Sequence, residues 1–380
     1  MCRGRAGRAL ALAGAGAGAW LLFVLADAWL PHARPAPGPR STGGGGEAEE
    51  PLLAEGRLAL EPAPCGGGAT ALVAVVSHAA HFAARDAQRR AWPDAELAAL
   101  GACRVFLLAR PPLRSPPAPA PAVHDALRDE QRRHGDLLQG DWAEGYRLLL
   151  RKHLLALRWL VRCCARAHLL LKMDDDVAAD VPWLLEHARR HLRGREGQAV
   201  LLGHVLAGAA PQRAPGDKWR LSREEFAADA FPRFVSGWAY VATAAAASAL
   251  LRIVDSAARP APLWIDDVYI TGVLAETAGV PRWDLPRPFA ADAALLRCCL
   301  RAPALRCDFA AAPDGGEPAL VAAAAAHARR CARAGPARCP ARAPARALNR
   351  TCVRALQPGH ARPLPADAPA DASVRPVSLR

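Results

Sequence analysis

The stretch LLLKMDDDVAAD, residues 169–180, places three adjacent aspartates, Asp174, Asp175 and Asp176, directly after an apolar run. The run has the length of a buried strand. Three like charges at the end of a strand repel one another, and a cation would offset that repulsion. Carboxylates spaced as D-x-D can hold a hard divalent cation that also binds phosphate oxygens. An acidic loop or helix N-terminus is the alternative, because capping and the helix dipole favour aspartates there.

Strand-like and helix-like segments alternate on both sides of the triplet. The sequence predicts strands at 69–77, 103–109 and 167–173, and helices at 85–92, 144–165 and 181–192. This alternation predicts an α/β domain with a mostly parallel sheet. Such sheets bind ligands at the carboxyl ends of their strands, which is where the triplet lies.

The composition limits the classes of protein that can carry this motif. The chain has 380 residues, 52% of them hydrophobic, which suffices for one large domain or two ordinary ones. Its formal net charge is +13, but the arginines are spread along the chain and only 6% of residues are aromatic. A nucleic-acid-binding domain concentrates basic residues on one face and adds groove-reading or aromatic partners. The sequence therefore argues against a nucleic-acid partner and favours a solvated basic surface.

The first 30 residues predict a membrane anchor. Residues 1–8 include three arginines and form the expected cytoplasmic tail, and residues 9–30 form the expected signal-anchor helix. The segment from Ala9 to Ala26 contains no charge and is just long enough to span a hydrocarbon core of about 30 Å. The basic flank should stay cytosolic, which leaves the rest of the chain lumenal. A cleavable signal peptide is the alternative, because alanine-rich segments offer cleavage sites.

The rest of the chain divides into a stem, a folded domain and a tail. Residues 31–68 form a Pro/Gly-rich stem without a periodic apolar face, residues 69–355 the folded domain, and residues 356–380 a Pro/Ala-rich tail. Ten of the eleven cysteines follow the anchor, and this even number permits a disulfide framework in an oxidising compartment. Asn349 begins an N-R-T glycosylation sequon.

Eight segments match the motifs of one family in order. They are RDAQRRAW (85–92), FLLA (106–109), HGDLLQGDWAEGYRLLLRKH (134–153), LLLKMDDDV (169–177), LLGHVLAGAAPQR (201–213), DKWRLSREEF (217–226), FPRFVSGWAYV (231–241) and WIDDVYITGVLAE (264–276). On these segments the chain resembles the β-1,3-glycosyltransferases of the galactosyltransferase type, glycosyltransferase family 31. The resemblance implies a GT-A fold, a UDP-sugar donor and a manganese ion.

The resemblance also implies a role for each aspartate of the triplet. Asp176 would be the chief metal ligand, with Asp174 and Asp175 near the metal, ribose and diphosphate. A divalent cation suits this chemistry, because it stabilises the charge that develops on a departing diphosphate. His327 lies in the region of the family's C-terminal histidine and is a candidate second metal ligand. The alternative is a histidine on a helix surface.

A second pair of aspartates supplies a candidate general base. Asp267 aligns with the aspartate of the family's E-D-V motif, and Asp266 replaces its glutamate. A carboxylate here could take the proton of an attacking hydroxyl, and Asp266 could orient the acceptor or Asp267. Both could instead cap the helix that follows. A single displacement without an enzyme nucleophile would invert the anomeric centre.

The remaining candidates line the two substrate sites. The expected donor-binding residues are Arg85, Arg89 and Lys152, and the expected cleft residues are Lys218, Trp219, Ser236, Gly237 and Trp238. The arginines could instead form ordinary ion pairs on a helix surface, and Trp219 could be core. Two departures from the family pattern stand out. Leucines at 148–150 replace its N-L-T, and Trp238 replaces a small residue.

These features predict a single-pass type II enzyme of the Golgi membrane with a lumenal catalytic domain. It would move galactose from UDP-galactose to a glycan on a glycoprotein or glycolipid. Transfer of N-acetylglucosamine from UDP-GlcNAc is one alternative, and a catalytically silent lumenal scaffold or glycan-binding protein is another. A phosphoryl-transfer enzyme is disfavoured, because the sequence lacks the loop G-x-x-x-x-G-K-[ST].

Overall fold

The computed structural model describes most of the chain between residues 53 and 363. The described residues are 53, 56–63, 65–66, 68–111, 120–195, 197–285, 287, 289–290, 292–343, 347–348, 352–357 and 360–363. The expected cytoplasmic tail, signal anchor and Asn349 lie outside them. Within the described ranges, no helix combines the length and apolarity needed to cross a bilayer.

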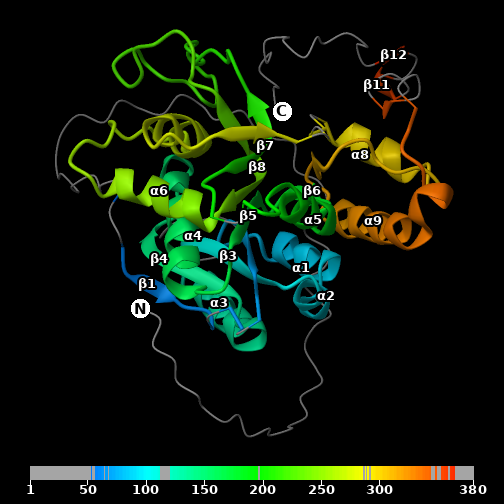
Figure 1. Ribbon diagram of the computed structural model, residues 1–380, viewed down its shortest axis with the longest axis horizontal. Helices are drawn as coiled ribbons and strands as arrows, with labels where there is room; N and C mark the ends of the chain where they lie inside the picture. Colours follow the sequence, from blue (N-terminus) through cyan, green and yellow to red (C-terminus); the bar gives the residue numbers. More distant parts are fainter. Residues whose placement is uncertain are drawn as a thin grey trace, which may run out of the picture. The chain divides into compact units, whose positions relative to one another are not determined.

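An eight-stranded mixed sheet forms the centre of the described domain (Figure 1). Its order is β1 (Leu58–Leu60), β4 (Leu137–Ala143), β3 (Ala102–Arg110), β2 (Ala71–Val76), β5 (Leu169–Asp174), β8 (Phe234–Thr243), β7 (Leu201–Leu206) and β9 (Arg282–Asp284). The four neighbours β4, β3, β2 and β5 run parallel. The pair β7 and β9 is also parallel, whereas β8 runs antiparallel to both β5 and β7 and β1 runs antiparallel to β4. The expectation of a mostly parallel sheet is therefore confirmed, with β1 and β8 as the strands that run in the opposite direction.

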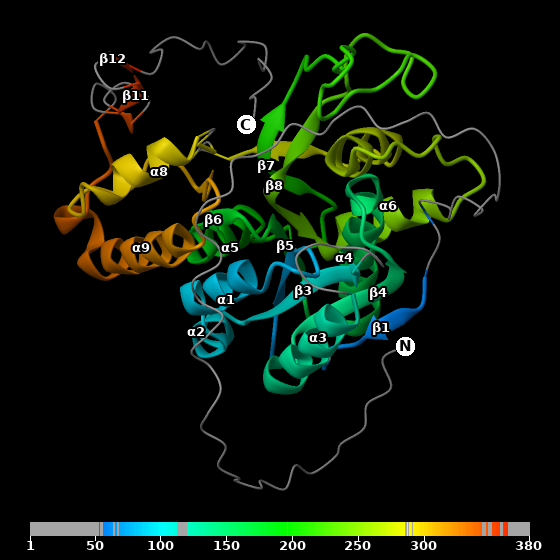
Figure 2. The ribbon, with the colours of Figure 1, turned by 180° about the vertical axis from the view of Figure 1, so that it is seen from behind.

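Two helical layers cover the two faces of the sheet (Figures 1 and 2). One layer contains α1 (Phe82–Ala91), α2 (Asp94–Ala99), α3 (Ala120–His134), α5 (Val181–His191), α8 (Ala293–Leu300) and α9 (Ala319–Arg338). The other contains α4 (Leu149–Cys163), α6 (Ala244–Val254) and the π-helix η2 (Val268–Leu274), which continues into α7 (Ala275–Thr277). Alternate residues of β2 enter opposite cores, so β2 is apolar throughout because both of its faces are buried.

Two expected elements differ from the structure. The helix expected over 144–165 begins later, because Gly145 has an extended backbone and only a short 3-10 helix, η1 (Tyr146–Leu148), precedes α4. Strand β4 was not expected, since its apolar run is interrupted by Gln139. That side chain is nevertheless buried, and its amide donates to the Ala109 carbonyl on β3 at 2.9 Å. Because this buried polar residue breaks the apolar pattern, the pattern does not predict the strand.

Both expected domain boundaries need correction. Within the expected stem, β1 pairs with β4, and Cys65 forms a disulfide with Cys103 on β3. The folded domain therefore begins before residue 69. At the other end, a hairpin of β11 (Val353–Gln357) and β12 (His360–Pro363) crosses the boundary expected after residue 355. A further two-stranded sheet joins β10 (Ala311–Pro313) to β6 (Val177–Ala179), just after the aspartate triplet.

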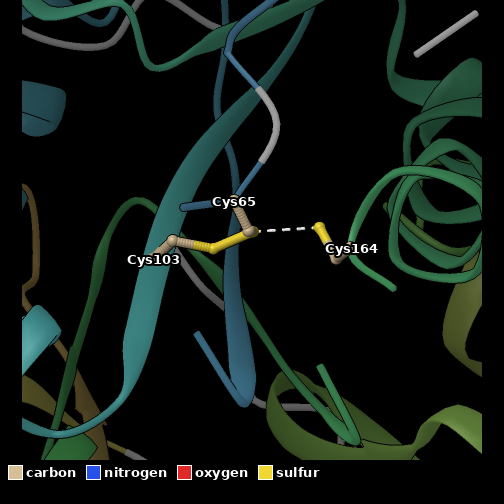
Figure 3. A group of neighbouring side chains, drawn as sticks. All are labelled: Cys65, Cys103 and Cys164. Atoms are coloured by element: carbon tan, nitrogen blue, oxygen red, sulfur yellow. Dashed lines mark hydrogen bonds between the residues drawn. A yellow bond between two sulfur atoms is a disulfide. The ribbon is translucent and has the colours of Figure 1, made fainter. Parts of the chain in front are cut away.

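Disulfides tie together the outer segments of the domain, as the even cysteine count permits. The described residues contain the pairs Cys65–Cys103, Cys298–Cys352, Cys299–Cys307 and Cys331–Cys339. Cys164, which follows α4, is a buried free thiol whose Sγ lies 2.9 Å from the Cys65 Sγ (Figure 3). Because two of these three sulfurs already share a bond, the cluster does not offer three thiolates to a metal ion.

We expect the Cys164 thiol to be unreactive in the native protein. Burial raises its pKa to about 11, so almost no thiolate forms near neutral pH. Iodoacetamide at pH 8 should leave Cys164 unmodified until guanidinium unfolds the chain, as peptide mass spectrometry can show. Rapid native labelling would mean that the end of α4 opens locally.

Candidate active site

The end of β5 delivers Asp174 and Asp175 into different environments. Asp175 is buried and bound to the segment that follows β2. Its carboxylate accepts from the Ser77 hydroxyl at 2.6 Å and contacts the His81 Nδ1 at 3.0 Å, while its backbone amide donates to Val76. Asp175 therefore fixes the ends of two neighbouring strands against each other.

Asp174 and Asp176 point to the open side of this edge. Burial raises the pKa of Asp174 to about 7, although the Lys172 ammonium, 2.7 Å from its Oδ1, opposes the shift. Asp176 is exposed, and its pKa is raised by desolvation and by the neighbouring Asp175 charge. Crowded carboxylates that resist ionisation are the type of site that a bound cation stabilises.

A fourth carboxylate, Asp314, joins the triplet from a distant part of the chain. It follows β10, and because β10 pairs with β6, its backbone amide donates to the Asp176 carbonyl at 2.8 Å. Its side chain is buried, and burial together with the charges of Asp176 and Asp175 raises its pKa to about 6. Asp314 is not among the residues that the sequence motifs predict. The available signal was an aspartate directly after a short apolar run, in the turn PDGG.

The second pair of aspartates lies at the start of η2. Asp267 Oδ2 accepts from the Gly237 amide at 2.9 Å, and its Oδ1 accepts from the Val268 amide at 2.8 Å. Burial and the Asp266 charge raise the pKa of Asp267 to about 6. The Oδ1 atom of Asp267 therefore caps η2, as expected if this aspartate is a helix cap. Capping alone does not account for the raised pKa of Asp267. The capping contact is therefore compatible with a chemical role for the same side chain.

Asp266 has the opposite electrostatic environment. Burial disfavours its charge, but a 2.9 Å hydrogen bond from His153 and the charge of Lys172 hold its pKa at about 2. Adjacent carboxylates whose environments separate their pKa values are typical of acid–base sites.

Lys172 connects the two acidic groups. Its ammonium is fully buried and donates to Asp174 at 2.7 Å and to the Gly237 carbonyl at 2.6 Å. The amide of the same glycine donates to Asp267. A Cβ atom at Gly237 would lie 3.1 Å from the Asp267 Cβ, so glycine permits this close approach. The triplet and Asp267 thus belong to one site at the edge shared by β5 and β8.

The three expected donor-binding cations are internal ion-pair partners in this structure. Arg85 is fully buried against Glu130, and its guanidinium also donates to the Ser77 hydroxyl at 3.2 Å. Lys152 is bound to Glu144 and donates to the Ser77 carbonyl at 2.7 Å. Both cations support the segment that holds Asp175. Arg89 bridges Glu130 and Asp136, each at 2.7 Å. Because Arg85 is buried and the Arg89 side chain is only 10% exposed, the surface ion-pair interpretation also needs correction.

His327 lies in a different environment from the triplet. It is buried in α9, where its Nε2 is 3.7 Å from the Cys331 Sγ and its Nδ1 is 2.8 Å from an Arg330 nitrogen. It is therefore not on the helix surface. Among the described residues, no hydrogen bond or ion pair joins it to Asp176. The nearby Cys299 and Cys307 form a disulfide and offer no thiolate.

An aromatic cluster lies beside the two acidic groups. Trp219 Nε1 donates to the Tyr146 hydroxyl at 2.5 Å, and the Lys218 ammonium lies 5.0 Å from the Tyr146 ring centroid. The Tyr146 ring also packs edge-on against Trp264, two residues before Asp266. Tyr146 is 44% exposed and was missed by the sequence analysis. An exposed aromatic ring with adjacent polar groups is a usual surface for binding a ligand.

The other expected cleft residues lie on β8. Ser236 is buried, whereas Trp238 is half-buried and packs against the core that contains α1 and α5. Gly237 between them contacts Asp267 and Lys172 through its backbone, as described above. Of the three, Gly237 is therefore the residue that the structure joins to the acidic site.

Comparisons with known proteins agree on one family. The family model described as Galactosyltransferase matches residues 83–286. Mouse UDP-GlcNAc:betaGal beta-1,3-N-acetylglucosaminyltransferase 8 is 34% identical over 209 residues, 55% of this chain and 50% of that protein. The human acetylgalactosaminyl-O-glycosyl-glycoprotein beta-1,3-N-acetylglucosaminyltransferase is 32% identical, over 58% of this chain and 56% of that protein. Dog beta-1,3-galactosyltransferase 4 is 31% identical, over 51% and 58%. The chain thus spans about half the length of the curated relatives it matches.

Proposed function

Because the chain belongs to the galactosyltransferase family, we propose that it is an inverting, metal-dependent β-1,3-glycosyltransferase with a GT-A fold. It would transfer a hexose from a UDP-sugar to a hydroxyl of a glycan acceptor. The observation that carries this proposal is the contact path from Asp174 through Lys172 and Gly237 to Asp267. Through this path, a cluster of carboxylates of the kind that binds cations and a candidate general base lie at one edge of the sheet.

The acidic group suits a hard divalent cation. Carboxylate oxygens are preferred ligands of manganese and magnesium. Asp176, which is exposed, and Asp314, which is bound to its backbone, would hold the ion, with Asp174 beside them. The ion would stabilise the negative charge that develops on the UDP diphosphate. His327 remains an alternative ligand, although the backbone hydrogen bond from Asp314 to Asp176 favours the aspartate.

Asp267 would perform the proton transfer. Its pKa of about 6 leaves it ionised at neutral pH, yet more basic than an ordinary carboxylate. It would accept the acceptor's hydroxyl proton while that oxygen attacks the anomeric carbon. The bond from the anomeric carbon to the phosphate oxygen breaks at the same time, and UDP leaves with the electron pair. One displacement of an α-linked donor yields a β linkage.

The donor sugar is either galactose or N-acetylglucosamine. We expected galactose, but the relatives named above include two N-acetylglucosaminyltransferases as well as a galactosyltransferase. Both donors therefore belong to the proposal on equal terms. A Golgi location behind an N-terminal anchor remains part of it, supported by the apolar segment of residues 9–30 and by the family.

A donor screen tests the proposed function. The full chain, purified in detergent, is incubated with manganese, one UDP-sugar at a time, and simple β-galactoside, β-N-acetylglucosaminide or α-N-acetylgalactosaminide acceptors. We expect a disaccharide product by mass spectrometry with UDP-galactose or UDP-GlcNAc. Manganese-dependent UDP binding without transfer to any acceptor would instead support the silent glycan-binding protein.

The aromatic cluster yields a prediction about the acceptor. Replacing Tyr146 by alanine should raise the acceptor KM by roughly 3- to 10-fold, because an aromatic contact is worth about 0.5–1.5 kcal/mol. The UDP dissociation constant should not change. The matched variant Tyr146→Phe keeps the ring and loses the hydroxyl that accepts from Trp219, so its effect should be smaller. A raised donor KM with an unchanged acceptor KM would place Tyr146 on the donor side.

A further inference from the structure

A path of buried polar side chains ends at Asp266. His153 on α4 and Tyr240 on β8 are both fully buried. The His153 Nδ1 lies 2.9 Å from the Asp266 Oδ2, and its Nε2 is hydrogen-bonded to the Tyr240 hydroxyl. Burying an imidazole and a phenol costs more than burying apolar side chains unless every polar atom is paired. Here each polar atom has a partner, so the three groups form one connected arrangement.

The contacts also place the protons. Asp266 is ionised, because the hydrogen bond from His153 and the Lys172 charge overcome its burial, and an ionised carboxylate only accepts. The His153 Nδ1 must therefore carry a proton. Among the described residues the Tyr240 hydroxyl forms no other hydrogen bond, so it donates to Nε2. The imidazole is then neutral, which agrees with the lowering of its pKa by burial.

We propose that His153 is a positioning residue for sugar transfer, whose neutral imidazole holds the Asp266 carboxylate in one orientation beside Asp267. This inference rests on the proposed function and extends it to a residue to which the resemblance assigns no role. His153 touches neither substrate in this account. It acts through Asp266, which in turn orients the acceptor hydroxyl and sets the environment of the base.

The physical need for such a residue comes from the two adjacent carboxylates. Two buried carboxylates side by side do not both ionise readily, so one of them takes up a proton first. The cation that faces the pair is Lys172 on β5, which acts on both aspartates, and the imidazole donor is His153 on α4, which donates to Asp266 alone. Asp174, Tyr146 and Tyr240 also interact electrostatically with the pair. His153 therefore keeps Asp266 ionised and leaves Asp267 as the group that exchanges a proton. Without that donor, the two aspartates would compete for the proton and Asp266 could turn away.

A matched pair of variants separates positioning from packing. In His153→Asn the amide nitrogen can take the place of Nδ1 and still donate to Asp266. In His153→Gln the amide reaches the place of Nε2 and keeps the Tyr240 contact, but no donor faces Asp266. Both variants lose ring volume and should lower the melting temperature to a similar extent. We expect kcat to fall by about 10²-fold in the glutamine variant, the cost of a misplaced catalytic group, with little change in either KM.

The asparagine variant should retain most of the wild-type kcat. Equal losses of kcat in the two variants, in step with their melting temperatures, would show that His153 acts only through packing. A kcat that survives in both would show that Asp266 does not need this donor. Either result overturns the proposal.

Nitrogen-15 NMR of the imidazoles in the full chain tests the same inference without turnover. The His153 signal, assigned by its loss in His153→Asn, should show a neutral ring protonated at Nδ1 from pH 6 to 8. It should change in Asp266→Asn, because the acceptor is altered. A charged ring, or one protonated at Nε2 only, would overturn the proposal. If no donor supports transfer, the proposed function fails, while the NMR result still decides whether His153 holds Asp266.

Discussion

Asp267→Asn should reduce transfer by roughly two to four orders of magnitude, the usual contribution of a positioned general base. Asparagine keeps the size of the side chain but cannot accept the acceptor's proton. The wild-type rate should fall as the pH drops below about 6, because Asp267, whose pKa is raised by burial and by Asp266, then becomes protonated. The variant should lack this acid limb.

Binding and stability distinguish this loss from unfolding. UDP and manganese should bind the Asp267→Asn variant nearly as they bind the wild type, because the carboxylates that we propose as metal ligands lie at the end of β5 and after β10. The melting temperature at pH 7 should change little. Two effects oppose each other: one of the Gly237 and Val268 amides loses an acceptor, while a buried charge with a raised pKa is removed.

The sign of the second effect follows from linkage. A carboxyl whose pKa is higher in the folded than in the unfolded chain binds its proton more tightly when folded, so this group makes stability decline as pH rises from about 4 to 6. At pH 7 the Asp267→Asn variant has no charge to bury at this position, so this loss of folding stability is absent. Asp229→Asn, at an exposed position, is the matched control and should change neither rate nor stability. If melting and activity collapse together in Asp267→Asn, the residue is a structural cap; if activity survives, Asp266 becomes the candidate base.

Removing the metal, or Asp176, should abolish transfer. We expect no product in excess chelator, recovery with added manganese, and a loss of metal-dependent UDP binding by calorimetry in Asp176→Ala. The reason is electrostatic: without a cation, the charge on the departing diphosphate is not stabilised at a site that already holds several carboxylates. Full activity in excess chelator would exclude the metal assignment.

The second ligand can be identified with two further variants. Asp314→Asn keeps the shape of the turn but weakens an anionic ligand, so manganese affinity should fall. His327→Gln should leave manganese affinity unchanged, because that ring contacts Arg330 and disulfide sulfurs. The opposite result, with affinity lost only in His327→Gln, would return the ligand role to the histidine.

Local sequence was sufficient for the elements that carry the first half of the site. The run of β5, apolar except for Lys172 and followed by aspartates, predicts a strand end with carboxylates, because burial on both faces favours a nearly continuous apolar segment. The helix α5 is similarly local, since Asp180 caps it through the Trp183 amide. Strand β4 was missed for the opposite reason: its buried polar residue, Gln139, is paired across the sheet, and no local pattern reports a partner 30 residues away.

The sequence by itself determined which groups of this protein could do chemistry: the triplet at 174–176 and the pair Asp266 and Asp267, each beside a regular element. Only the tertiary structure decided how they work together. The Lys172–Gly237 contact spans 65 residues and depends on the antiparallel pairing of β8 with β5. The His153–Asp266 contact spans 113 residues and depends on the packing of α4 and η2 into the same core. Burial at that junction separates the pKa values of two adjacent aspartates, because desolvation and hydrogen-bond donors act through space and not along the chain.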